Sequence, residues 1–144
     1  MKSSTKILNA IATGVSASTA EFDTQGFNYA KIYVCTVGTV APATNGNNIT
    51  ESDTSGGTFN AISGLVQGTD YTLSTATNNT SVAKIVYGIP LGGRKRYLKA
   101  TFTSGSSVTA NHAIICELSD PYDSILVRRA GTAATDAAGS VVNI

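Results

Sequence analysis

The 144-residue chain has few of the side chains on which most enzymatic catalysis depends. One histidine, two cysteines and nine carboxylates leave few groups able to titrate, attack a substrate or bind a metal ion. The sequence also lacks a phosphate-binding glycine loop, a dinucleotide-binding fingerprint and a paired-cysteine metal motif. We therefore expect a protein that is not an enzyme, with no catalytic site, no cofactor and no metal ion.

Charge is equally scarce. Charged residues make up 13% of the chain and the formal net charge is +1, against roughly a quarter charged in ordinary globular proteins. Proteins that hold the nucleic-acid backbone need a broad basic field, and the sequence has none. No apolar run approaches the roughly 20 residues that cross a bilayer. The sequence thus predicts neither a nucleic-acid partner nor a membrane partner.

The first twenty residues have the outline of a secretory signal peptide, with lysines ahead of the apolar run Ile7–Val15. Asn9, Thr13 and Gly14 interrupt that run. We therefore expect residues 1–20 to form an uncleaved N-terminal arm.

Hydroxyl side chains and glycine are abundant, with 35 serine and threonine residues and 14 glycines. Tyr97–Thr103 alternates, with Leu98, Ala100 and Phe102 on one face, as a half-buried strand does. Phe27–Gly38 carries apolar residues at both odd and even positions, so we expect this strand to be buried on both faces. The remaining expected strands are Val82–Ile89, Asn111–Leu118 and Ser124–Arg128, with weaker ones at Asn48–Ser52 and Tyr71–Ala76.

Helical spacing of apolar residues is missing, and β-branched residues are common. The predicted fold is therefore all-β: an antiparallel β-sandwich or jelly roll of about seven or eight strands, over residues 21–129. Ser104-Gly105-Ser106 is expected to be a short hairpin loop. Residues 130–144, small-sided and then apolar, are expected to form a C-terminal arm that docks on a neighbour, with a frayed tail as the alternative.

Cysteine, histidine and clustered carboxylates often form catalytic or metal-binding sites, but each has a structural interpretation in this sequence. Cys35 and Cys116 lie on apolar strands and are expected to be small buried residues, with a disulfide between them as the alternative. His112 is expected to be a strand residue, and a Ser-His-Asp hydrolase would need it at a pocket mouth. Calcium could be held by Glu51 and Asp53, or by Glu117, Asp120 and Asp123, but turns are the commoner interpretation.

All four arginines of the chain belong to two basic clusters at strand ends. One cluster is Arg94, Lys95 and Arg96, and the other is Arg128 and Arg129. Arginine is favoured at interfaces, whereas solvated basic strand ends also discourage edge-to-edge aggregation. The clusters are thus either partner contacts or solvated strand ends.

Three blocks occur in the order and spacing of a known family. They are Phe22-Asp23-Thr24-Gln25-Gly26-Phe27 with Ala30–Val34, then Glu51-Ser52-Asp53 with Gly57-Thr58-Phe59 and Ile62, and Lys95-Arg96-Tyr97-Leu98-Lys99-Ala100-Thr101 before an apolar strand. Over Glu21–Leu118 the chain resembles the capsid cement or decoration proteins of tailed-bacteriophage heads. Tyr71–Val82 and the extension Asp120–Ile144 have no counterpart in that resemblance.

The resemblance implies a β-sandwich or jelly-roll structural protein of the virion, without catalytic residues. It would be made in the host bacterial cytoplasm, would bind the outer surface of the assembled capsid through the major capsid protein, and would associate as a homotrimer. The alternative is a jelly-roll carbohydrate- or receptor-binding module of a phage fibre or tail, although the chain has no tryptophan. The expected partner contacts are Arg94, Lys95, Arg96, Arg128, Arg129, Val141, Val142 and Ile144.

Overall fold

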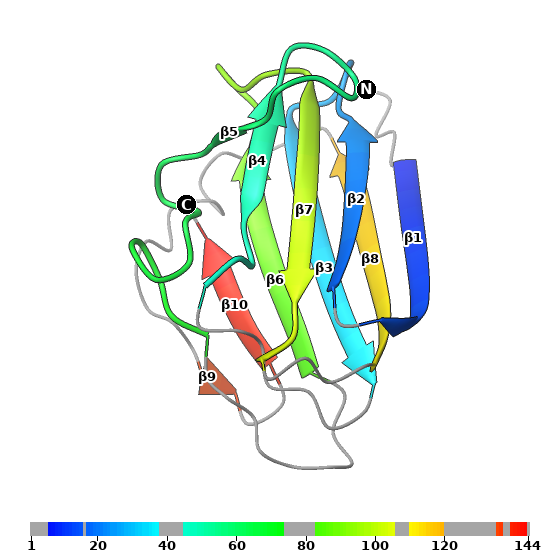
Figure 1. The fold of residues 1–144 in the computed structure, drawn as a ribbon. Coiled ribbons are helices and arrows are strands. Elements are labelled where there is room, and N and C mark those ends of the chain that lie inside the picture. Colours follow the sequence, from blue (N-terminus) through cyan, green and yellow to red (C-terminus); the bar gives the residue numbers. More distant parts are fainter. Residues whose placement is uncertain are drawn as a thin grey trace.

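The computed structural model describes residues 6–15, 17–37, 45–73, 83–105, 110–119, 135–136 and 139–143. These residues form ten strands in two sheets and contain no α-helix (Figure 1). The predicted all-β sandwich is therefore confirmed. The described part of the chain contains no helix long and apolar enough to cross a membrane.

The larger sheet has six strands in the order β1-β8-β3-β6-β10-β9. Their bounds are β1 Lys6–Val15, β8 Ala110–Ser119, β3 Tyr29–Val37, β6 Ala83–Pro90, β10 Gly139–Asn143 and β9 Thr135–Asp136. The smaller sheet has four strands in the order β2-β7-β4-β5. Their bounds are β2 Ala17–Asp23, β7 Tyr97–Thr103, β4 Ile49–Ser52 and β5 Asn60–Ala61.

The first eight strands have the connectivity of a jelly roll. The order β1-β8-β3-β6 in one sheet faces β2-β7-β4-β5 in the other, so successive strands repeatedly change sheets, as in two nested Greek keys. All pairs among these eight strands are antiparallel. The jelly roll is complete before β9 and β10 are added.

The inner faces of both sheets form one core. On β7 the predicted alternation is confirmed, because Leu98, Ala100 and Phe102 are buried between partly exposed neighbours. From the larger sheet, Ile32 and Ile114 are also fully buried. Burial of this much apolar surface is the main stabilising contribution to the fold.

The strand β3 differs from its prediction on one face. Its inward residues Ala30, Ile32 and Val34 are at most 1% exposed. Its alternate residues Lys31, Tyr33 and Cys35 are partly exposed. The expectation that this strand is buried on both sides is wrong, because the structure places no second layer of described residues over its outer face.

The N-terminal segment expected as an arm is sheet over its described residues. Lys6–Val15 pairs with β8 in register from Lys6 opposite Leu118 to Ala12 opposite His112. Ala17–Ala20 begins β2 and pairs with β7. Apolar residues on both faces of β1 hide its alternation in the sequence, and its pairing partner lies about a hundred residues further along the chain.

The C-terminal segment adds a strand to the jelly roll. Gly139–Asn143 forms β10 and pairs in parallel with Lys84–Gly88 of β6. β6 would otherwise be the outer strand of the larger sheet, and its residues 85–89 are all buried. The segment expected to dock on a neighbour therefore lies, over these five residues, against its own chain.

The connections after β7 and after β4 differ in the sheets that they join. The loop after Ser104 was expected to close a hairpin, but β7 and β8 belong to different sheets, so that prediction is wrong. Asn60–Ala61 pairs back on Thr50 and Glu51, so β4 and β5 form a hairpin within the smaller sheet. The expected strand Ser124–Arg128 lies outside the described residues.

Candidate interaction surfaces

The basic cluster at residues 94–96 is neutralised by carboxylates of the same chain. Arg96 forms a bidentate pair with Asp23, in which Nε and Nη2 donate to the two carboxylate oxygens over 2.9 and 2.7 Å. Lys95 Nζ lies 2.9 Å from Asp53 Oδ2. The hydrogen bond from Arg96 to Asp23 raises the pKa of the guanidinium. The cluster is therefore not a free positive patch.

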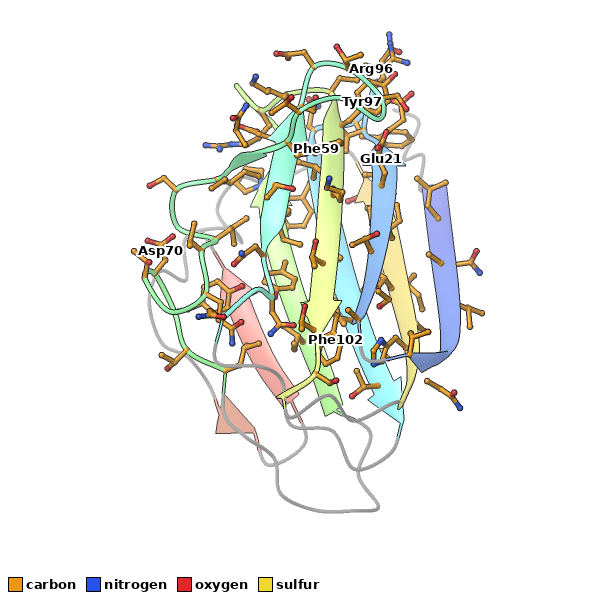
Figure 2. The ribbon with its side chains drawn as sticks, in the orientation of Figure 1. Glu21, Phe59, Asp70, Arg96, Tyr97 and Phe102 are labelled. Atoms are coloured by element: carbon orange, nitrogen blue, oxygen red, sulfur yellow. The ribbon has the colours of Figure 1, made fainter. Side chains whose placement is uncertain are left out.

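Glu51 and Glu21 hold the loops that surround this cluster. Glu51 accepts the backbone N–H of Lys95 and lies 3.6 Å from Arg94 Nη1. Glu21 accepts the Ser55 hydroxyl over 2.7 Å. Arg96, Tyr97, Glu21 and Phe59 lie toward one end of the sandwich, away from Phe102 (Figure 2). Glu51 and Asp53, two candidate calcium ligands, thus serve ion pairs, and Glu51 also accepts a loop hydrogen bond.

Among the described residues, no three histidine, cysteine or carboxylate side chains come together as a metal-binding group. Asp120 and Asp123, the other candidate calcium ligands, lie outside the described residues.

His112 lies inside the sandwich on the inward face of β8. It is 1% exposed, and its ring packs edge-on against Phe102 with centroids 4.6 Å apart. Nδ1 lies 3.0 Å from the Ser18 hydroxyl, in a hydrogen bond, while Nε2 is buried with no hydrogen-bond partner in the described structure. Burial lowers the pKa of the imidazole. A hydrolytic histidine at a pocket mouth is incompatible with this position.

The two cysteines are free and lie on opposite faces of adjacent strands. Cys116 is fully buried opposite Ile32, and burial raises the pKa of its thiol to about 12. Cys35 faces outward and pairs in register with Ala113. Their registers differ by three residues, about 10 Å along the strands, so no disulfide joins them.

A buried polar network, which no sequence motif indicates, holds the loops beside β6. Gln67 Oε1 accepts both the backbone N–H and the side-chain amide of Asn47, over 3.0 and 2.8 Å. The Tyr71 hydroxyl donates to the Asn47 carbonyl oxygen and lies 3.1 Å from the Tyr87 hydroxyl. Burial raises the pKa of Tyr71 to about 12 and that of Tyr87 well above its usual value. The network holds loops together and presents no reactive group to solvent.

The outer face of the larger sheet is mainly apolar. Register places Ile11, Ala113 and Cys35 in one row across β1, β8 and β3. The next row is Asn9, Ile115 and Tyr33. We call the apolar face the set of Ile7, Ile11, Tyr33, Cys35, Ala113 and Ile115.

Polar groups border the apolar face along one row. Lys31 lies in register with Glu117. The Tyr33 hydroxyl donates to Glu117 Oε2 over 3.1 Å. Burial and the Glu117 charge raise the pKa values of Tyr29 and Tyr33. This border row also contains Ile7, and Lys84 of β6 lies in register with Cys35 of the apolar face.

The outer face of the smaller sheet has the opposite character. Its outward residues on β2 and β7 are threonines and charged side chains, apart from Ala17 and Tyr97. Lys99 lies 4.0 Å above the Phe59 ring and Arg96 lies 5.0 Å above the Tyr97 ring. We call this the polar face.

The expected contact residues are therefore dispersed. Arg94, Lys95 and Arg96 pair with the chain's own carboxylates. The Cα atoms of Val141 and Val142 lie in register with Val86 and Tyr87 of β6. Arg128, Arg129 and Ile144 lie outside the described residues. Apolar residues at both odd and even positions of Phe27–Gly38 are the sequence signal for the apolar face, and the outward ones, such as Tyr33 and Cys35, are partly exposed.

The eight-stranded order defines the fold as a jelly roll. The crystal structure of the SPBc2 prophage-derived protein YomS is similar, with a TM-score of 0.50 and 16% identity, covering 83% of this chain and 96% of that one. A protein of the Bacillus endospore appendages, which form disulfide-linked pili, gives a TM-score of 0.33 at 9% identity and covers 83% of this chain and 89% of that one. No family model and no curated protein sequence matches the chain. The likeness to YomS supports the fold.

Proposed function

We propose that the chain is a structural protein of a tailed-phage virion that binds the outer surface of the assembled capsid. Three observations support the proposal. The jelly roll is a fold of viral capsid domains, although it also hosts lectins. The blocks over Glu21–Leu118 resemble capsid cement proteins, and a protein with a similar fold, YomS, is prophage-derived.

The apolar face is the observation that carries the proposal. Contiguous apolar surface bordered by polar residues marks interaction sites. Ile7 and Ile11 are exposed, and the other members of the apolar face are partly exposed. Interface cores are depleted of lysine and glutamate and enriched in tyrosine. Ile115 and Tyr33 lie side by side in the second row of the face, with Ile11 one row away. The major capsid protein is the proposed occupant of this face.

The proposed mechanism requires no bond-making chemistry. A protein that binds the assembled shell and not its loose subunits stabilises the shell by mass action. Symmetry repeats the contact over the shell, so many individually weak contacts add up. The proposed location is the capsid surface, and the stabilisation increases with occupancy.

The basic cluster has a secondary role in this proposal. Because Asp23, Asp53 and Glu51 already neutralise it, the cluster holds the loops at one end of the sandwich. If the capsid bound to this cluster, its acidic groups would have to replace Asp23, Asp53 and Glu51 in these ion pairs. The contacts expected of Arg128, Arg129, Val141, Val142 and Ile144 remain predictions.

A carbohydrate- or receptor-binding module is the second candidate. Phe59 and Tyr97 are partly exposed aromatic rings toward one end of the polar face, where a sugar could stack (Figure 2). Each ring has a cation over it, Lys99 and Arg96 respectively. Stacking a sugar on either ring would displace that cation, which makes this candidate the weaker one.

Co-sedimentation with purified capsids of the encoding phage tests the proposal. Ile115→Asp places a charge in the middle of the apolar face and is expected to weaken capsid binding by about tenfold or more, equivalent to about 1.4 kcal/mol. Thr101→Asp is the matched control, because Thr101 is a partly exposed strand residue on the polar face. Equal binding of both variants would contradict the proposal. Loss of binding by the Thr101 variant alone would favour the second candidate.

A further inference from the structure

β1 is an edge strand with an exposed apolar side. β8 pairs with one side of it, and no described strand pairs with the other (Figure 1, dark blue). Ile7 and Ile11 are 68% and 72% exposed and are the exposed large hydrophobic residues of the described structure. Natural proteins usually protect such an edge with charge, proline or a bulge, because its unpaired backbone groups can bind another strand.

Protection is found at the ends of β1 and not in its middle. Lys6 stands at the first position of the strand. The register with β8 shifts between Ala12 and Val15, which is a bulge or irregularity. Between these limits Lys6–Ala12 pairs regularly with β8, and Asn9 is the centre of that segment.

We infer that β1 pairs in an antiparallel manner with β1 of a second copy, about a two-fold axis at Asn9. This register places Ile7 opposite the partner's Ile11, and Ile11 opposite the partner's Ile7. Registers shifted by two residues would place an isoleucine opposite the partner's Asn9. Shifts of one residue would turn the outer side chains toward the inner face. The register centred on Asn9 therefore matches apolar with apolar.

Packing favours the same arrangement. Lys6 is the charged residue of β1, and this register places it opposite the partner's Ala12. Leu8 and Ala10 lie half-buried against the core, on the inner side of the strand. The pairing places Leu8 opposite the partner's Ala10, so the inner side also gains apolar contacts. A two-fold interface of this kind uses the same patch on both subunits.

We call this pairing of β1 with β1 of a second copy the seam. The seam is independent of the proposed capsid binding, because it needs only a second copy of this chain. The seam has two-fold symmetry, so it forms a dimer. The resemblance to phage capsid proteins implies a trimer instead. In the dimer the two apolar faces become one continuous surface across the joined sheets.

Light scattering coupled to gel filtration of the full chain, over a range of concentrations, tests the seam. We expect a dimer. Ile11→Glu places a carboxylate opposite the partner's Ile7, and is expected to raise the dimer dissociation constant by about tenfold or more. Ile7→Lys is expected to have the same effect. Both side chains are exposed, so neither change removes core packing.

The double variant I7K/I11E tests the register. It places each new lysine opposite a new glutamate of the partner, so dimerisation is expected to recover at low salt and to weaken at high salt. Thr101→Glu on the polar face is the matched control and is expected to dimerise as the unmodified chain does. A monomeric unmodified chain would overturn the inference. So would a dimer or trimer that Ile11→Glu leaves intact, or a double variant that does not recover.

Discussion

The two outer faces of the sandwich share one fold and one core but differ in chemistry. On the larger sheet, Ile11, Ile115 and Tyr33 lie in adjacent rows, with Lys31 and Glu117 in the row beyond them. On the smaller sheet, Thr19 and Thr101 lie opposite each other in register and charged residues follow them. A face that meets only water needs no such apolar surface. This difference is the reason for proposing the apolar face as the side that contacts a partner.

The largest expected difference between the core and the apolar face is in the reactivity of the two cysteine thiols. Cys35 is partly exposed, whereas Cys116 is buried and its thiol pKa is raised to about 12, so little thiolate forms. Iodoacetamide should label Cys35 in the folded protein and label Cys116 only after denaturation. Peptide mass spectrometry gives the two labelling levels. Equal labelling of both in the folded protein would contradict the assigned faces.

Core truncation should be far more costly than truncation on the apolar face. Ile32→Ala empties a fully buried site and is expected to lower the free energy of unfolding by about 2–5 kcal/mol. Ile115→Ala, on a partly exposed residue of the same sheet, should cost less than about 1.5 kcal/mol. Urea unfolding measures both. A similar loss for the two variants would mean that another layer covers the apolar face.

Half-buried strands could be predicted from the sequence, because buried and exposed residues alternate along them with period two. Leu98, Ala100 and Phe102 are a clear case, and their strand was predicted with its correct bounds. β1 was missed because isoleucine and leucine occupy both of its faces, so no alternation is visible. Whether an apolar outer face is covered depends on the presence of another layer, which local sequence does not encode.

The pairing of distant segments could not be predicted. Asp23 and Arg96 are 73 residues apart and form a bidentate ion pair because β2 and β7 are neighbours. The turn after Ser104 looked like a hairpin, since a tight polar loop between two strands gives the same local signal whether the strands share a sheet or change sheets. The candidate surface follows from this topology and not from any motif.

We expect stability to depend on pH through His112, which is buried in the core. Burial lowers its pKa in the folded state, whereas an unfolded histidine titrates near 6.5. Below that pH the unfolded chain binds the proton more readily, so stability should fall as the pH is lowered from about 7 to 5.5. His112→Gln should show a smaller fall in urea midpoint over this range. An identical fall in both proteins would show that His112 is not the group responsible.

The smallest effect is expected on the polar face. Thr101→Val replaces a partly exposed β-branched residue with another of similar shape. The free energy of unfolding should change by no more than about 0.5 kcal/mol. Thermal unfolding checks this value, and a loss above about 1 kcal/mol would show that the threonine hydroxyl is needed for folding.

Hydroxyl-radical footprinting of the chain, free and bound to capsids, compares the two faces most directly. Tyr33 and Ile115 report on the apolar face, and Tyr97 and Phe59 report on the polar face. We expect binding to protect Tyr33 and Ile115 from oxidation and to leave Tyr97 and Phe59 unchanged. Protection of Tyr97 and Phe59, with Tyr33 and Ile115 still oxidised, would rule out the apolar face as the capsid contact.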